Sequence, residues 1–390
     1  MSEAKETKSR PSGQITLVFQ GGGALGAYQA GVYQALHEAG IEPDWIIGTS
    51  IGAINASLIA GNAPSDRLTA LQEFWARVQK KEPAGLWAAG LGIASAFTVN
   101  PFVDQENLST FTNGIPGFFE PNLEAFLGGG QKRLGTARVG LYSTEPLRKT
   151  LTELVNFDLI DSSRPRLAVG AAEVATGRMR YFDSRDMRLS VDHVVASGAL
   201  PPAFPPVLID GAYYWDGGIL SNTPIEAIFD DRERKSGTVF AVHVWNANGD
   251  NPETLFQVAN RQKDIQYASR AASHVMRQKQ IHRLRHIIKE LEAHIPPSER
   301  DDPMVKELLS WGCLTRIHVV RLQAPPLEND NHLKDIDFTK RGIRTRWSLG
   351  YEHTMRAIEK SPWTVDPDPL EGVILHEGPD FVASLSTLGG

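Results

Sequence analysis

A serine inside a glycine-rich turn is the first residue whose type and spacing point to chemistry. Ser50 stands in Gly48-Thr-Ser-Ile-Gly52, a G-x-S-x-G pattern between an apolar run and a helical pattern. In this context the two glycines, Gly48 and Gly52, allow a tight turn that lifts the hydroxyl above the end of a strand. Such a serine attacks acyl carbonyls, and the helix that follows favours the developing negative charge. The alternative is a chance match in which Ser50 only caps the helix.

A second glycine motif comes earlier in the chain. Gly21-Gly-Gly-Ala-Leu-Gly26 has the form G-x-G-x-x-G and follows the apolar run at 15–20. Free amides in such a loop can hold an anion or an oxyanion. Dinucleotide binding is the alternative, but it predicts an acidic residue at the end of the second strand, and Asp44 comes before that strand. The candidate oxyanion donors for Ser50 are the amides of Gly21, Gly22 and Gly23.

The base that would activate Ser50 is less evident. A hydrolase with a histidine base would use a residue late in the chain, and the candidates are His193, His243 and His318. The apolar surroundings of His243 favour a structural role. Asp216 instead opens an Asp-Gly-Gly sequence directly after the apolar segment 213–215, although this sequence alone is more typical of a simple turn.

In this order the three motifs resemble those of the patatin-like phospholipase family, over about residues 15 to 245. The resemblance implies an α/β protein with a three-layer α/β/α fold and a mostly parallel central sheet. It also implies a dyad of Ser50 as nucleophile and Asp216 as general base, without a cofactor or a metal. Many members carry Arg or Lys where this chain has Leu25. The matching motif residues, besides the block 196–206, are Gly21, Gly22, Gly23, Gly26, Gly48, Ser50, Gly52, Asp216, Gly217 and Gly218.

Periodic patterns predict the elements that must position these residues. Strand, helix, strand, helix around the first two motifs is a βαβ rhythm, which predicts parallel strands with right-handed crossovers. Apolar runs predict strands at 15–20, 45–47, 166–174, 179–182, 213–215, 238–245 and 317–322. Helices are predicted at 25–39, 50–61, 191–197, 253–292 and 345–359.

The same patterns divide the chain into a flexible tail at 1–13, a catalytic domain at 14–250 and a mainly helical C-terminal extension at 251–390. Through 334–338 and 341–351 the extension resembles the extra domain of a bacterial patatin-like subgroup, and a helical layer over the sheet is its simplest role. Six phenylalanines could line an acyl pocket, but ordinary core is favoured because aromatic residues mostly bury. They are Phe97, Phe102, Phe111, Phe118, Phe119 and Phe126.

Composition limits the classes of function. The chain has 390 residues, a net charge of −6 and one cysteine, Cys313. Its mild acidity argues against nucleic-acid binding, which needs a basic surface. No apolar leader or run of about 18 apolar residues is visible. We therefore expect a cytoplasmic protein that contacts a membrane surface only transiently, at its periphery.

Motifs and resemblance together imply a serine acyl hydrolase of the lipase, phospholipase A or lysophospholipase type. Its substrates would be lipid or acyl esters, cleaved through an acyl-enzyme on Ser50 with Asp216 as the base. Two alternatives from other classes stay open at this point. One is a nucleotide-binding protein that uses the loop 21–26, and the other is a non-catalytic scaffold that presents its C-terminal helices to a partner.

Overall fold

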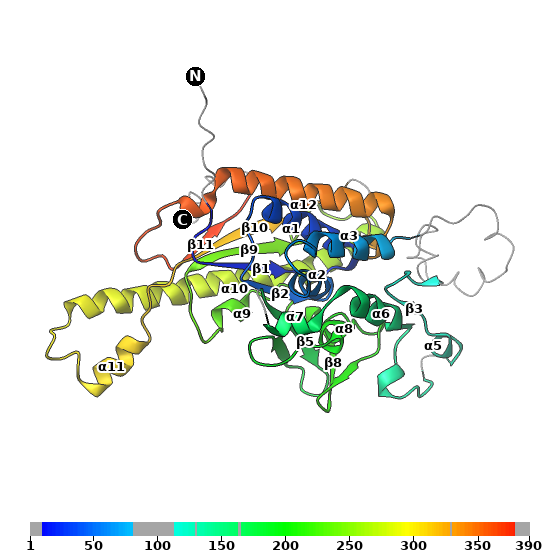
Figure 1. Ribbon diagram of the computed structural model, residues 1–390, viewed down its shortest axis with the longest axis horizontal. Helices are drawn as coiled ribbons and strands as arrows, with labels where there is room; N and C mark the ends of the chain where they lie inside the picture. Colours follow the sequence, from blue (N-terminus) through cyan, green and yellow to red (C-terminus); the bar gives the residue numbers. More distant parts are fainter. Residues whose placement is uncertain (1–9, 81–112, 129–130, 163–164, 328–329, 379–390) are drawn as a thin grey trace, which may run out of the picture.

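A nine-stranded, mostly parallel sheet organises the chain in the computed structural model, which describes residues 10–80, 113–128, 131–162, 165–327 and 330–378 (Figure 1). The strand order is β11-β10-β9-β1-β2-β5-β8-β7, and β6 pairs with β5. The bounds are β1 Gln14–Phe19, β2 Trp45–Thr49, β5 Arg166–Glu173, β6 Met179–Asp183, β7 Val207–Ile209, β8 Ala212–Asp216, β9 Gly237–His243, β10 Ile317–Gln323 and β11 Val373–His376. A separate antiparallel pair joins β3 (Glu120–Pro121) to β4 (Tyr142–Ser143).

Helices cover both faces of the sheet. In Figure 1, α1 and α12 lie above the strands, and α9 and α10 lie below them. Alternate side chains of β1 point to opposite faces of the sheet and pack against the helices on each face. Leu17 and Phe19 belong to the core on the α1 side, whereas Val18 packs in the core that contains Val275 of α10. The predicted three-layer α/β/α fold is confirmed. The helical bounds are η1 Gly23–Gly26, α1 Ala27–Glu38, α2 Ile51–Ala60, α3 Arg67–Arg77, α5 Leu123–Gly128, η3 Thr136–Arg138, α6 Glu145–Leu154, α7 Phe157–Ser162, α8 Val191–Ser197, η4 Gly217–Ile219, α9 Glu226–Phe229, α10 Leu255–His294, α11 Pro303–Ser310, η5 Lys334–Ile336, α12 Lys340–Lys360 and η6 Pro362–Thr364.

The C-terminal extension is mainly helical, as predicted, and it also completes the sheet. The strand predicted at 317–322 is β10, and β11, which the sequence patterns did not predict, pairs with it. Both strands continue the sheet in parallel beyond β9. A helical layer is therefore an incomplete description of this region, since the sheet runs across the predicted boundary at residue 250. Most of the predicted tail, 1–13, lies outside the described residues.

A close contact joins the extension to α1. A Cβ added to Gly31 would lie 1.9 Å from the carbonyl oxygen of Trp347, and one added to Gly350 would lie 2.0 Å from that of Tyr28. Any larger residue at these two positions would force the helix backbones apart. The Trp347 indole Nε1 also donates to Gln34 Oε1 at 2.6 Å. Helix α12 is thus seated directly on the first helix after the glycine loop.

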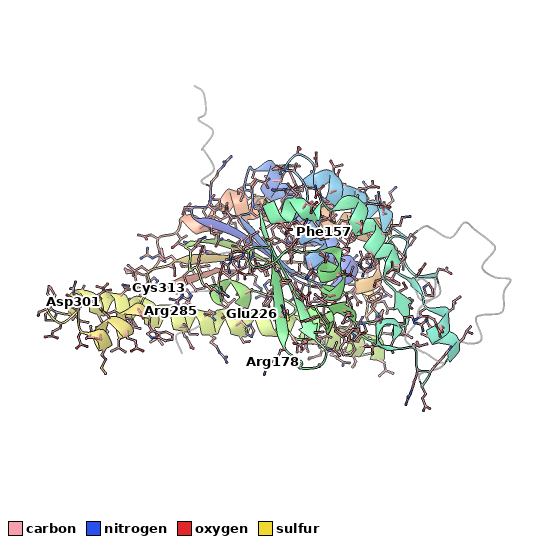
Figure 2. The ribbon with its side chains drawn as sticks, turned by 60° about the horizontal axis from the view of Figure 1, so that its bottom comes forward. Phe157, Arg178, Glu226, Arg285, Asp301 and Cys313 are labelled. Carbon is pink, nitrogen blue, oxygen red and sulfur yellow. The ribbon has the colours of Figure 1, made fainter. Side chains whose placement is uncertain are left out.

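Helix α10 continues beyond the sheet and forms an arm with α11. Its 40 residues give it a length of about 60 Å. Thr254 caps its first turn by accepting from the Gln257 amide. Asp301, in the turn before α11, lies at the far end of this arm (Figure 2). Within the described ranges, no helix combines the length and the apolar character needed to cross a membrane.

Candidate active site

Ser50 occupies a sharp turn between β2 and α2. Its φ of 55° lies where residues other than glycine are rarely found, so the turn stores strain. The Ser50 amide donates to Ser197 at both the carbonyl oxygen (3.1 Å) and Oγ (3.0 Å), which holds the turn in place. Gly52 allows close packing, because a Cβ there would lie 2.3 Å from the carbonyl oxygen of Phe19. The Ser50 side chain makes no capping hydrogen bond to α2, contrary to the capping alternative.

Strand register brings Asp216 to the same edge of the sheet. Thr49 of β2 pairs with Gly170 of β5, and Ala171 of β5 pairs with Asp216. Asp216, the last residue of β8, therefore pairs one residue along β5 from the partner of Thr49, which places it close to the end of β2, where Ser50 begins its turn. The Ser50 and Asp216 side chains are hydrogen-bonded to each other.

The Asp216 carboxyl is buried, and in the described chain it has no cationic partner. Its exposed fraction is 2%. Burial raises its pKa to about 7, although hydrogen bonds from Ser50 and from the Gly218 amide, at 2.7 Å, act to lower it. A carboxyl with this pKa is divided between its two protonation states at neutral pH, which suits a group that takes up and returns a proton.

The first glycine loop lies against Ser50 and offers two free amides. Gly21 N–H donates to the carbonyl oxygen of Asn222 at 3.1 Å, which removes Gly21 from the predicted oxyanion donors. The amides of Gly22 and Gly23 donate to no other described residue and line the same cavity as Ser50. Within the described ranges the Ile51 amide, in the first turn of α2, also has no acceptor, and it is a donor that the glycine motifs did not indicate.

Three buried side chains hold this loop in place. Asn222 Nδ2 donates to the carbonyl oxygens of Gly21 (3.1 Å) and Tyr267 (3.3 Å). Trp245 Nε1 donates to the Gly21 carbonyl oxygen at 2.8 Å. Gln20 Oε1 accepts from the Trp245 amide at 3.0 Å, and its Nε2 donates to Tyr267 O at 3.1 Å. The sequence motifs do not indicate these positions; the available signal was the polar Gln20 at the end of an apolar strand.

A cavity of about 230 Å³, here called the Ser50 cavity, opens beside Ser50 and Asp216. Phe118 and Phe119 line it while also packing in the core, so both expectations for them hold. Phe126 contacts Tyr142 instead, and Phe97, Phe102 and Phe111 lie outside the described residues. Other apolar walls come from Leu200, Ala203 and Phe204, and the C-terminal extension adds Tyr267, Asp335, Ile336 and Phe338.

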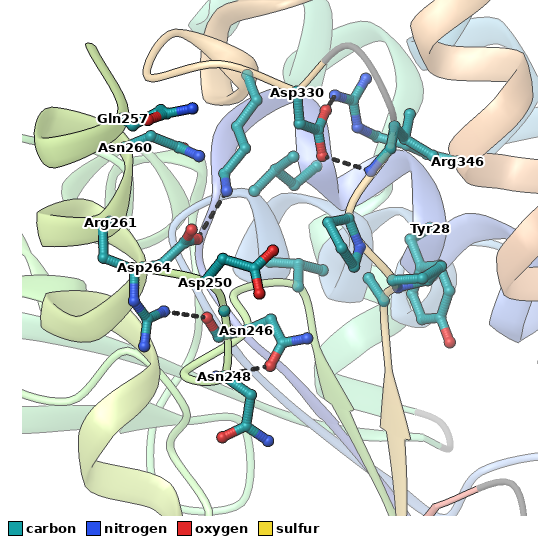
Figure 3. Close-up of a pocket in the computed structure, with 18 of the residues that line it drawn as sticks. Tyr28, Asn246, Asn248, Asp250, Gln257, Asn260, Arg261, Asp264, Asp330 and Arg346 are labelled. Atoms are coloured by element: carbon teal, nitrogen blue, oxygen red, sulfur yellow. Dashed lines mark hydrogen bonds and ion pairs between the residues drawn. The ribbon is translucent and has the colours of Figure 1, made fainter. Parts of the chain in front are cut away.

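A neighbouring cavity of about 260 Å³, here called the polar cavity, holds paired charges (Figure 3). Lys334 Nζ lies 2.7 Å from Asp264 Oδ1, and an Arg346 nitrogen lies 2.8 Å from Asp330 Oδ1. Leu25 occupies the position where many proteins with the same three motifs carry Arg or Lys. It lines this cavity together with Lys334. The Lys334–Asp264 pair clamps α10 to the segment 330–346, and the Arg346–Asp330 pair joins the two ends of that segment, which also carries Asp335 to the Ser50 cavity.

The histidine candidates have other contacts. His193 caps α8. His243 is buried in β9, and burial lowers its pKa to about 3. His318 Nδ1 lies 3.0 Å from His376 Nε2 on the neighbouring strand. Among the described residues none of the three hydrogen-bonds to Ser50, so Asp216 is the base candidate that the geometry favours.

Asp44, the acidic residue nearest to the pattern expected for dinucleotide binding, lies at the other end of the sheet. Its Oδ2 accepts from the Ile15 amide at 3.0 Å, so it sits at the start of β1, whereas the glycine loop follows the end of that strand. A strand of six residues separates the two by about 20 Å, which is too far for one ribose. In the described part of the chain, no three His, Cys, Asp or Glu residues group as metal ligands.

Two family models match successive parts of the chain. One, described as patatin-like phospholipase, matches residues 17–229, and another, described as patatin phospholipase (DUF3734), matches 265–370. Lysophospholipase nte1 of Aspergillus terreus is 57% identical over 49 residues, which are 13% of this chain and 3% of that protein. YqhO of Bacillus subtilis is 25% identical over 233 residues, 56% of this chain and 67% of that protein.

The chain thus matches only a small part of the first relative and about two thirds of the second. A crystal structure of VipD from Legionella pneumophila shows a looser likeness, with a TM-score of 0.39 and 17% identity over 90% of this chain and 68% of that chain. The patatin-like model covers more than half of the chain and includes both Ser50 and Asp216. On this ground the chain belongs to the patatin-like phospholipase family.

Proposed function

We propose that this protein hydrolyses carboxylic esters of lipids through an acyl-enzyme on Ser50. The observation that carries the proposal is the hydrogen bond between Ser50, at a strained turn, and the buried carboxyl of Asp216. Membership of the family supports lipid esters as the substrate class. The mostly apolar walls of the Ser50 cavity support an acyl chain as its occupant.

In the proposed mechanism Asp216 accepts the Ser50 proton as Ser50 Oγ attacks the ester carbonyl. The amides of Gly22, Gly23 and Ile51 then donate to the oxyanion, and the loss of one such donor costs about 3 kcal/mol of transition-state stabilisation. The tetrahedral intermediate collapses when the bond to the leaving oxygen breaks and Asp216 returns the proton to that oxygen. Asp216 next accepts a proton from a water molecule as its oxygen attacks the acyl carbonyl. The bond to Ser50 Oγ then breaks, and Asp216 returns the proton to Ser50, which releases the acid.

Ser50→Ala and Asp216→Asn test this mechanism. Each variant is expected to fold and to lower kcat/KM for p-nitrophenyl butyrate by at least about a thousandfold. A fluorophosphonate probe should label the wild type and not Ser50→Ala. For the wild type, kcat/KM should fall about tenfold per pH unit below pH 7, because the protonated Asp216 cannot accept the serine proton.

The matched control is Ser310→Ala, which removes a serine hydroxyl from exposed α11 and should leave the activity unchanged. Full activity of Asp216→Asn would contradict the dyad. Inactivity of a folded His193→Ala or His243→Ala protein would indicate a histidine base instead.

A further inference from the structure

Tyr267 of α10 enters the Ser50 cavity from outside the segment that carries the three motifs. It lies in the part of the chain matched by the second family model, 265–370. Its ring packs on Trp245 with the ring centroids 5.0 Å apart, and its carbonyl oxygen accepts from Gln20 and Asn222. The side chains that hold the glycine loop therefore hold Tyr267 as well.

The phenol of Tyr267 has no hydrogen-bond partner among the described residues, although the side chain is half-buried. A half-buried hydroxyl that faces a cavity is available to a bound molecule. Burial raises its pKa, and the nearby Asp216 and Asp335 carboxylates raise it further. The phenol therefore keeps its proton at neutral pH, so it can donate a hydrogen bond but cannot act as a base.

Asp335 is itself held in place at this cavity. Lys263 Nζ donates to both of its carboxylate oxygens, at 2.8 and 3.0 Å. Its carbonyl oxygen lies 2.2 Å from where a Cβ on Gly23 would be, so the extension presses directly on the glycine loop. The backbone around Tyr267 and Asp335 is thus built against the proposed oxyanion donors, and Tyr267 lines the same cavity as Asp216.

We propose that Tyr267 donates a hydrogen bond to the leaving-group oxygen as the tetrahedral intermediate collapses. The inference rests on the proposed hydrolase function. The leaving oxygen must come close to Asp216, which returns a proton to it, and Tyr267 lines the cavity in which that carboxyl lies. In this step the bond between carbon and leaving oxygen breaks, the proton passes from Asp216 to that oxygen, and Tyr267 keeps its own proton.

The strength of such a hydrogen bond depends on the charge of the leaving oxygen. An alkoxide concentrates its charge on one atom, whereas p-nitrophenolate spreads the charge over its ring and needs little assistance. Tyr267→Phe removes only the unpartnered hydroxyl and keeps the ring contact with Trp245. We expect kcat/KM for ethyl butyrate to fall about tenfold to a hundredfold, and that for p-nitrophenyl butyrate by less than about threefold.

The control is Tyr351→Phe, which removes a phenol that lies on α12 and binds Glu38 at the surface. It should change neither rate. An equal loss of kcat/KM on both esters would mean that Tyr267 only shapes the cavity, and no loss on either would mean that its hydroxyl takes no part in the reaction. Either result overturns the inference about Tyr267. The proposed function still stands in both cases if the wild type hydrolyses p-nitrophenyl butyrate. Inactivity of the wild type on both esters would overturn the two together.

Discussion

The Ser50 cavity and the polar cavity differ in whether their buried aspartates are paired with a cation. In the polar cavity Asp264 is paired with Lys334 and Asp330 with Arg346. In the Ser50 cavity Asp216 has hydrogen bonds but no described cation, and burial raises its pKa to about 7. A paired carboxylate is a structural clamp, whereas a buried and unpaired one is ready to exchange a proton. The comparison teaches that cations pair with the carboxylates that hold the extension, including Asp335 with Lys263, whereas Asp216, where proton transfer is proposed, is paired with none in the described chain.

Removal of the clamp should have the largest effect on stability. Lys334→Met leaves the Asp264 carboxylate buried without a partner, and we expect the free energy of unfolding to fall by about 3–5 kcal/mol. Urea unfolding followed by tryptophan fluorescence measures this change. The double variant Lys334→Met with Asp264→Leu removes both charges and should recover most of the loss. A single-variant loss under about 1 kcal/mol would show that this pair is not a clamp.

Replacement of the unpaired Asp216 should instead raise the free energy of unfolding at neutral and alkaline pH. The folded-state pKa of Asp216 is about 7 against an ordinary value of 3.8, so the folded protein binds this proton more tightly than the unfolded chain does. The stability from this group is present below pH 4 and is lost as the pH rises to 7. Asp216→Asn should therefore be more stable than the wild type at pH 8, by up to about 4 kcal/mol, and equal to it below pH 4.

Urea unfolding at pH 4, 6 and 8 measures the difference between the two proteins. Asp301→Asn, at an exposed aspartate in the turn before α11, is the control and should track the wild type at every pH. A gain for Asp216→Asn that stays constant across this range would mean that the carboxyl is not perturbed by burial.

An exposed ion pair should show the smallest effect. Lys306 Nζ lies 2.8 Å from Asp301, but the two side chains are 61% and 86% exposed. Lys306→Met makes the same change as Lys334→Met, and it should alter the free energy of unfolding by less than about 0.5 kcal/mol. Similar losses in both variants would show that burial does not distinguish the two pairs.

Local sequence patterns were enough to predict the turn at Ser50, the glycine loop and the parallel strands between them. Each depends on neighbours within a few residues: Gly48 and Gly52 shape the Ser50 turn, and an apolar run precedes each glycine motif. The order of the motifs and the resemblance pointed to Asp216. The register between β5 and β8 then placed it beside Ser50.

Long-range contacts explain what the sequence could not predict. The Gly21 amide is engaged by the main chain of Asn222, about 200 residues away, and no pattern in the glycine loop reveals that bond. Tyr267 and Asp335 reach the Ser50 cavity because α10 covers the sheet and β10, which precedes Asp335, is one of its strands. Strand β11 is a four-residue edge strand, and so short an apolar run gives a weak periodic signal.

The contact between α12 and α1 means that α1 can complete its packing only late in synthesis of the chain. Gly31 meets the backbone of Trp347, which the ribosome adds more than 300 residues later. At ordinary translation speeds of about 5–20 residues per second, the side of α1 that faces α12 waits roughly 15 to 60 s for its partner. Because Asp335 presses on the glycine loop from the same late part of the chain, the newly made protein completes the surroundings of Ser50 only near the end of that wait.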